Sequence, residues 1–301
     1  MIEPILRDSI IYATSLVLIT VGITLTYMTS RVPNFAQGTF VTVGMYVALT
    51  MGRLYTVSPY AASILGFFVS GFLSYLMYQL VISPQLARNA PITSLIMTTI
   101  AIDTLFTGIL NIYADYIQLT FKVISRAFLL TDLDFAVGGE PGVFIVSPVL
   151  AIALIVGLHL ILSRTRFGVA MRAAVANPGL ASVLGVNVRF VYSISWFMAG
   201  GLAGVAGAFY TLWFQGSPDA AFSLLISAFS GSVLGGLFSI YGAFFGGYFV
   251  GLTEILGTTL AANIVGPWIT AYRPAIPLAL IAITLLLIPR GITSIGWRRR
   301  T

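Results

Sequence analysis

The residues of this chain that could take part in chemistry are few, and most lie inside apolar stretches. Two sets of polar residues recur at helical spacing: Thr99, Asp103, Thr107 and Asn111, and Ser223, Ser227 and Ser230. Each set forms one stripe along a helix. A charge at the centre of a membrane helix costs about 2.5–3.5 kcal/mol, so Asp103 must face protein or water. The stripes are candidates for lining a translocation path, and the alternative is hydrogen bonding between helices. Glu254 is a further candidate for the path.

Enzymatic and metal chemistry is largely excluded by what the chain lacks. It has no cysteine, one histidine (His159) and one lysine (Lys122). Thiolate sites, iron–sulfur clusters and multi-histidine metal centres are therefore ruled out. Lys122 follows no glycine-rich loop, so there is no Walker A motif. We expect no cofactor, no metal site and no catalytic residue, and any energy from ATP must enter from another subunit. His159 is expected near the cytoplasmic end of its helix, as an interfacial residue.

The elements that carry these residues must be membrane helices. Of the 301 residues, 58% are hydrophobic and 8% are charged, against about 25% charged in soluble domains. This composition predicts an all-α, polytopic transmembrane helix bundle of about eight or nine spans, forming a single domain over residues 1–301. The apolar segments are roughly 9–29, 36–51, 58–82, 92–113, 142–163, 190–212, 220–238, 241–259 and 274–289. The first is expected to be a retained helix rather than a cleaved signal peptide.

The arginines predict which parts face the cytoplasm. Residues 164–189 hold four arginines and no acid, the tail ends in three arginines, and residues 114–141 are net negative. By the positive-inside rule, 164–189 and the tail are cytoplasmic and 114–141 is outside. The net charge of +6 thus indicates membrane topology, and no nucleic-acid partner is expected. The N-terminus is outside if segment 36–51 crosses fully, and inside if that segment is a re-entrant half-helix.

The loop 164–189 carries more structure than a simple connection needs. Residues 166–176 favour a helix, and Asn177 followed by Pro178 favours the start of a second short helix that runs to Gly185. Two short, alanine-rich helices form a knob that can enter a groove of another protein. The alternative is a positively charged loop that happens to be helical.

Several motifs resemble ABC import permeases of the branched-chain amino acid type (the LivH/LivM family). The loop residues that look like the coupling loop of that family are Arg172, Ala173, Ala174, Asn177, Ala181 and Gly185. The segment Asn34-Phe35-Ala36-Gln37-Gly38 resembles the family motif after the first helix. Further similar segments are Ala199–Gly207, Val233–Ala243 with Gly246, Gly247 and Glu254, and Ile288–Gly291. Phe238 and Tyr241 depart from the pattern, standing where glycine and proline are usual.

The resemblance implies a permease subunit of an ABC importer in the cytoplasmic (inner) membrane. Its implied partners are a second homologous permease, two cytoplasmic ATPases, an extracytoplasmic substrate-binding protein and the lipid bilayer. The coupling loop would dock in an ATPase, so Ala174→Glu is expected to place a charge in that contact, and Glu254 would serve a structural or gating role. Branched-chain or other hydrophobic amino acids are the implied substrates. Urea or short amides, and an ion-coupled secondary transporter, remain alternatives.

Glycines recur at four-residue spacing in the later segments. The pairs are Gly200/Gly204, Gly231/Gly235, Gly242/Gly246 and Gly247/Gly251. Small residues at this spacing let membrane helices approach closely. We expect most of the pairs to pack helices within the chain, and the rest to be available to a second permease subunit.

Overall fold

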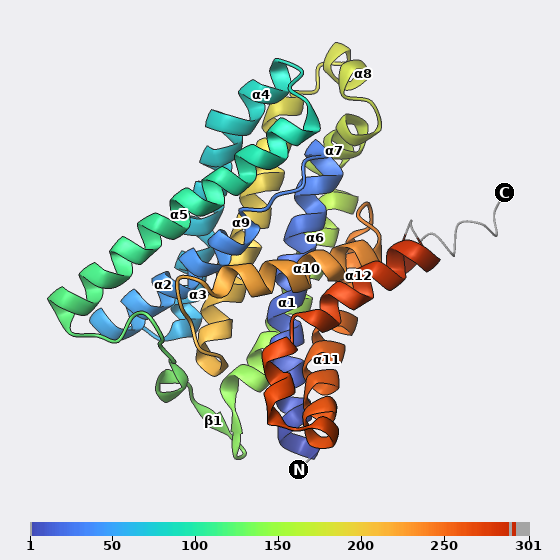
Figure 1. The fold of residues 1–301 in the computed structure, drawn as a ribbon. Helices are drawn as coiled ribbons and strands as arrows, with labels where there is room; N and C mark the ends of the chain where they lie inside the picture. The colour runs from blue at the N-terminus through green and yellow to red at the C-terminus, as the bar shows by residue number, and fades with distance from the viewer. Residues whose placement is uncertain (1, 289–290, 293–301) are drawn as a thin grey trace.

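The computed structural model describes residues 2–288, 291 and 292, and it is almost entirely helical (Figure 1). The expected turn at Pro289-Arg290 and the arginine tail lie outside the described residues. The elements are α1 (Ile2–Ser30), α2 (Gln37–Leu54), α3 (Pro59–Met77), η1 (Tyr78–Ile82), α4 (Ser83–Ala87), α5 (Ile92–Phe121), η2 (Thr131–Leu133), β1 (Ala136–Val137), β2 (Glu140–Pro141), α6 (Gly142–Arg164), α7 (Arg166–Ala176), α8 (Pro178–Val183), α9 (Val188–Trp213), α10 (Ala220–Gly235), α11 (Ile240–Val265), η3 (Pro267–Tyr272) and α12 (Ala275–Leu287).

The expected all-α polytopic bundle is confirmed, whereas the span count is resolved only in part. Each of the nine apolar segments contains a helix. Six helical stretches are long and apolar enough to cross a membrane: Pro4–Ser30, Pro59–Ala87, Ile92–Phe121, Gly142–Arg164, Val188–Trp213 and Ile240–Val265. The helices α2, α10 and α12 have 18, 16 and 13 residues. Because the rise is about 1.5 Å per residue, α10 and α12 do not span about 30 Å of hydrocarbon by themselves.

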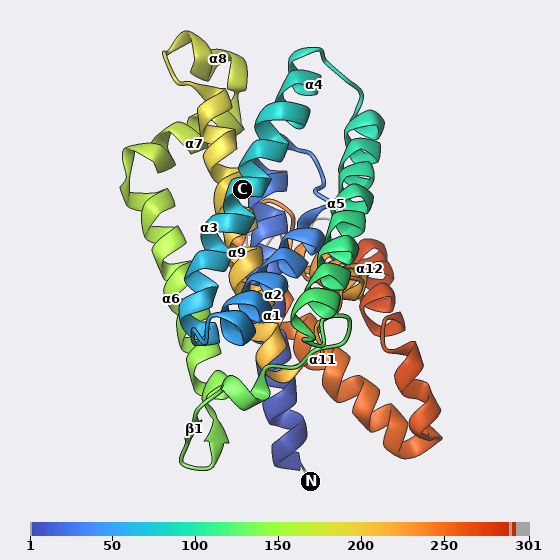
Figure 2. The same cartoon turned by 90° about the vertical axis from the view of Figure 1, so that its left-hand side faces the viewer.

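Helix α1 forms the centre of the bundle, with α2 and α9 beside it (Figures 1 and 2). Of the most apolar window of α1, 94% is buried, against 17% for α5 and 22% for α6. Helix α9 packs against α1, α2 and α3, and α11 packs against α1. The outward faces of α5 and α6 are therefore available to lipid or to another subunit.

Glycine allows the closest helix approaches in this core. A Cβ on Gly44 of α2 would collide with the backbone of Gly204 in α9, and a Cβ on Gly204 would collide with the carbonyl of Gly66 in α3. The four predicted glycine pairs also face neighbours in the same chain; for example, Gly247 lies against Val17 and Gly251 against Ala13. The expectation that most of these pairs pack helices within the chain is confirmed.

The two ends of the bundle carry different parts of the chain. Arg7 near the start of α1 forms an ion pair with Glu140 in the β1–β2 hairpin (3.2 Å), and Arg53 at the end of α2 pairs with Asp132 (2.6 Å). The hairpin lies at the lower end in Figure 1, and α7 and α8 lie at the upper end. The stretch 31–36 together with α2 thus returns the chain to the end at which it starts.

Candidate functional site

Side-chain caps define each short helix of the loop between α6 and α9. The Thr165 hydroxyl accepts from the backbone N–H of Gly168 (3.3 Å) at the start of α7. The Asn177 side chain accepts from the N–H of Leu180 (3.0 Å), and Pro178 is the first residue of α8. Gly185 has a φ of +84°, which glycine adopts without strain. The two helices predicted from the sequence are thus present, with the expected break at Asn177.

The inner face of α7 is seated on α6 and α9. A Cβ on Gly168 would collide with the backbone of Leu162, and the Arg172 guanidinium donates a hydrogen bond to the Leu162 carbonyl. The Tyr192 hydroxyl of α9 donates to the carbonyl of Ala174 (3.1 Å), and the Ala174 side chain is fully buried. This contact fixes the direction of α7 relative to the long helices.

The burial corrects part of the expected docking surface. Ala174 is 0% exposed and Ala181 is 2% exposed within this chain alone, so neither can touch a partner directly. Ala174→Glu would therefore unseat α7 from α9 instead of placing a charge in a partner contact. Ala173 is half-buried, whereas Arg172, Asn177 and Gly185 are exposed.

The outer face of α8 presents apolar side chains without cover. Val183 is 84% exposed, and Leu180 and Leu184 are exposed beside it. Three neighbouring large apolar side chains at the tip of a short capped helix are a feature of interaction sites. We call Leu180, Val183 and Leu184 the α8 tip. The sequence analysis did not single out this set, although all three are large apolar residues in a loop that otherwise consists mostly of arginine and small residues.

The first polar stripe faces α2. The Asp103 carboxylate of α5 accepts a hydrogen bond from the Thr39 hydroxyl of α2. Thr99, one turn earlier, is buried and accepts from the backbone N–H of Phe35 (3.4 Å). Thr107 is half-buried further along the same helix. The stripe thus contacts α2 and the stretch before it, as the cost of a lipid-facing carboxylate requires.

The serine stripe mainly joins helices. The Ser230 hydroxyl of α10 donates to the carbonyl of Pro277 in α12 (2.9 Å). Ser227 is buried and accepts a hydrogen bond from the Tyr12 hydroxyl of α1 (3.4 Å), while it donates to the carbonyl of Ser223 in its own helix (3.2 Å). Ser223 is exposed. For Ser227 and Ser230 the structure therefore supports the alternative of hydrogen bonding inside the protein, and Ser223 is the member that a solute could reach.

Glu254 belongs to a buried cluster that the sequence analysis did not assemble. Its Oε1 accepts from the Tyr12 hydroxyl (2.9 Å) and from Arg273 Nε (2.7 Å). The Arg273 guanidinium lies over the Tyr12 ring, 4.2 Å from the ring centroid. Arg273 is the one charged residue between Glu254 and Arg290 in the sequence. A single charge in so apolar a stretch is the feature of the sequence that could have indicated a buried ion pair. The cluster ties α1, α11 and the turn before α12 together, which fits a structural or gating role for Glu254.

The residues of the motif after the first helix form buried hydrogen bonds at the start of α2. The Asn34 amide donates to Gln37 Oε1 (3.0 Å), and Gln37 Nε2 donates to the carbonyl of Ala199 in α9 (2.9 Å). Asn34, Gln37 and Gly38 are all buried. These bonds satisfy polar groups where α2 begins inside the bundle, which is necessary in a membrane because no water can replace them.

The acidic residues are confined to one end and to the interior. The nine acids of the chain are Glu3, Asp8, Asp103, Asp115, Asp132, Asp134, Glu140, Asp219 and Glu254. None of them lies in or beside α7 and α8. At the opposite end, Arg53 donates to both carboxylate oxygens of Asp132 (2.6 and 2.7 Å) and lowers the pKa of that carboxyl. The α7–α8 end thus carries arginine charge without any acid to balance it.

A family model described as the permease component of branched-chain amino acid transport systems matches residues 5–289. The chain belongs to this permease family. It is 39% identical over 98% of its length to a probable branched-chain amino acid transport permease protein LivH of Methanocaldococcus jannaschii, covering 93% of that protein. It is 26% identical over 91% of its length to the permease protein BraD of Pseudomonas aeruginosa, covering 90% of it. As a member of this family, the chain is a multi-pass membrane permease and not an enzyme.

The fold is shared beyond these relatives. A chain of the structure described as PsaBC from Streptococcus pneumoniae in complex with Fab is similar with a TM-score of 0.52. The identity is 10%, and the match covers 95% of this permease and 92% of that chain. At this identity the likeness concerns the fold alone.

Proposed function

We propose that this permease moves branched-chain amino acids into the cell as the membrane subunit of an ABC importer in the cytoplasmic membrane. Family membership supports the substrate class, because the LivH and BraD relatives are named for it. The α7–α8 loop supports the ABC class, because a capped helix pair with an uncovered apolar tip offers a docking site for another protein. The chain has no Walker A motif, so the ATPase must be a separate subunit.

The partners of this importer would occupy opposite ends of the bundle. Two ATPases would dock at the α7–α8 ends of this permease and of a second homologous permease, on the cytoplasmic side. An extracytoplasmic binding protein would deliver substrate to the end that carries the β1–β2 hairpin. The arginine asymmetry supports this orientation. The chain would then cross the membrane nine times as a single permease domain, with α2, α10 and α12 extended by irregular backbone, which membranes tolerate inside proteins.

The path for the amino acid would run beside α5 and α10. Thr99, Asp103 and Thr107 on α5 and Ser223 on α10 are the polar groups nearest to such a route, with Ser227 and Glu254 supporting it from inside. Helix α5 is poorly covered by the rest of the chain, which leaves its outer face for the second permease. Selection among amino acids would rest largely with the binding protein, because few polar groups are exposed along these helices.

The exposed α8 tip is the observation that supports the ABC assignment, and cysteine cross-linking tests the proposed contact of this tip with the ATPase. The chain has no native cysteine. In the assembled complex, Val183→Cys is expected to cross-link to a cysteine in the docking groove of the ATPase, while the buried Ala181→Cys is not. In a separate variant, Val183→Asp is expected to reduce transport and transport-coupled ATP hydrolysis at least tenfold, with unchanged membrane insertion. Full activity of Val183→Asp would refute the assignment.

A further inference from the structure

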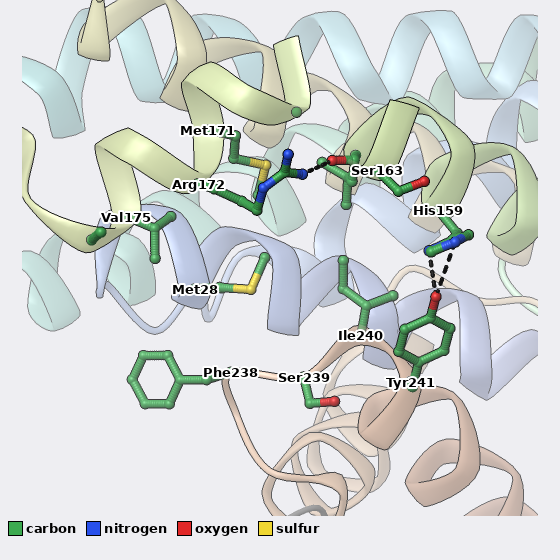
Figure 3. Close-up of a pocket in the computed structure, with 13 residues that line it drawn as sticks. Met28, His159, Ser163, Met171, Arg172, Val175, Phe238, Ser239, Ile240 and Tyr241 are labelled. Carbon is green, nitrogen blue, oxygen red and sulfur yellow. Dashed lines mark hydrogen bonds between the residues drawn. The ribbon is translucent and has the colours of Figure 1, made fainter. Parts of the chain in front are cut away.

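A second site lies at the α7–α8 end, beside the coupling loop. A pocket of about 430 Å³ opens between α1, α6, α7 and the turn that leads into α11 (Figure 3). This volume is within the range of about 300–1,000 Å³ that small-molecule sites occupy. Its walls include Met28, Met171, Val175 and Ile240, and its polar groups include Arg172 and His159. The candidate path residues do not line this pocket, and Arg172 is the one residue of the expected coupling set that does.

The walls of the pocket come from the two halves of the chain. Tyr241 at the start of α11 forms a hydrogen bond with the imidazole of His159 on α6 and so links the two sides (Figure 3). Phe238 and Tyr241 are both exposed. These two residues are also the ones that depart from the glycine and proline of the resembled signature. Their aromatic rings extend the apolar wall at the position where a smaller or more rigid residue would leave it open.

The pocket opens beside exposed apolar surfaces of α6 and α11. One turn before His159 on α6, Val156 is exposed, and one turn after Tyr241 on α11, Phe245 is exposed. Both helices are long and apolar enough to span the membrane. Tyrosine and other amphipathic rings are enriched at the level of lipid head groups. Tyr241 is thus suited to the level at which the hydrocarbon ends and the head groups begin.

The charge around the pocket is positive and not balanced by acid. Arg172 lies in the wall, and the guanidinium of Arg31 lies 5.5 Å from the centroid of the Phe238 ring. Neither arginine forms an ion pair with any of the described residues. Basic pockets between membrane helices on the cytoplasmic side are suited to anionic lipid head groups.

We propose that this pocket binds one anionic phospholipid of the inner leaflet. The phosphate lies at the rim with Arg172 and Arg31, and an acyl chain fills the apolar part against Met28, Met171 and Ile240. Because α7 forms one wall and the turn before α11 forms another, the lipid bridges the coupling loop to the α10–α11 half of the permease. The proposal concerns a site separate from the amino acid path and does not depend on the transported substrate.

The test is lipid binding to the purified full-length permease after removal of copurified lipid. Native mass spectrometry with added phosphatidylglycerol or phosphatidylcholine should show one tightly bound phosphatidylglycerol, preferred at least tenfold. Each arginine near a membrane surface contributes about a fivefold change in affinity for anionic lipid. Arg31→Gln and Arg172→Gln should each weaken phosphatidylglycerol binding by about that factor. The matched control is Arg88→Gln, an exposed arginine at the end of α4, which should leave binding unchanged.

A second pair of variants tests the acyl part without changing charge. Val175→Trp should fill the pocket and reduce the binding of both lipids at least tenfold, whereas Val169→Trp, exposed on α7 and outside the pocket, should not. Equal binding of the two lipids by the wild type would overturn the proposal. An equal loss in Arg31→Gln and Arg88→Gln would also overturn it, because the effect would then be one of overall charge. Displacement of the lipid by soluble glycerol phosphate would contradict the acyl contact.

Discussion

The close packing of α9 against α2 and α3 predicts that glycine-to-alanine substitutions change the unfolding free energy in opposite directions at packed and at open helix positions. Gly204→Ala adds a methyl group at a place where the backbone of Gly66 and the Ser70 hydroxyl already lie, the latter 2.7 Å from the new carbon. Backbone cannot move aside as a flexible side chain can. Overpacking of this kind costs about 1–3 kcal/mol, and we take the upper value, about 3 kcal/mol, because the obstruction is backbone.

Helix propensity opposes this cost by a known amount. Replacing glycine by alanine inside a helix gains about 1 kcal/mol. The net destabilisation expected for Gly204→Ala is therefore about 2 kcal/mol. At Gly108 on α5 and Gly157 on α6, an added Cβ would have nothing within 4 Å apart from its chain neighbours and the backbone of its own helix. Gly108→Ala and Gly157→Ala should thus stabilise the permease by up to about 1 kcal/mol, so the matched variants should differ by about 3 kcal/mol.

The assay is denaturant unfolding of the isolated permease in one detergent, with the three variants measured beside the wild type. The expected order of unfolding free energy is Gly157→Ala and Gly108→Ala above the wild type, and Gly204→Ala below it. If Gly204→Ala is as stable as the wild type or more so, the helices can separate without loss, and the close packing of α9 on α3 does not hold the core together.

Three further outcomes follow from the charged groups. Arg273→Gln should lower the yield of folded permease strongly, because an unpaired buried carboxylate costs about 3–5 kcal/mol, and adding Glu254→Gln should restore much of that yield. Asp103→Asn should retain assembly and most uptake, whereas Asp103→Leu should lower uptake or complex yield, since it loses the hydrogen bond from α2. Because Arg53 holds the pKa of Asp132 below its ordinary value, the pair adds stability above about pH 4 that disappears as the pH falls. This exposed pair is worth at most about 1 kcal/mol, so Asp132→Asn should remove a small acid-dependent slope in unfolding free energy measured between pH 3 and 5.

The sequence predicted well which segments form helices, because hydropathy and capping are local properties. The nine apolar segments, the break at Asn177 and the glycine pairs each depend on neighbouring residues alone. The shortness of α2 could also be suspected, since Arg31 and Pro33 interrupt the apolar pattern before it. The extended stretch that follows α1 agrees with that interruption.

The sequence could not predict which side chains meet across the bundle. Glu254 lies on α11 and Arg273 in the turn before α12, and an arginine at the edge of an apolar segment usually indicates topology. Ala174 and Ala181 illustrate a second limit, because an alanine in the sequence does not indicate whether its side chain is buried or exposed. The orientation of Ala174 depends on Tyr192 and on the packing of α7 against α6, and neither contact has a local sequence pattern.

The central claim, that ATP hydrolysis at the α7–α8 end drives amino acid uptake, is tested most directly in proteoliposomes. The permeases, the ATPases and the binding protein are reconstituted together, and labelled leucine uptake is measured with ATP supplied on the side of the α8 tip. The account predicts uptake that requires ATP hydrolysis and the binding protein, and that Val183→Asp reduces at least tenfold. Uptake that proceeds without ATP and follows an imposed proton or sodium gradient would contradict it.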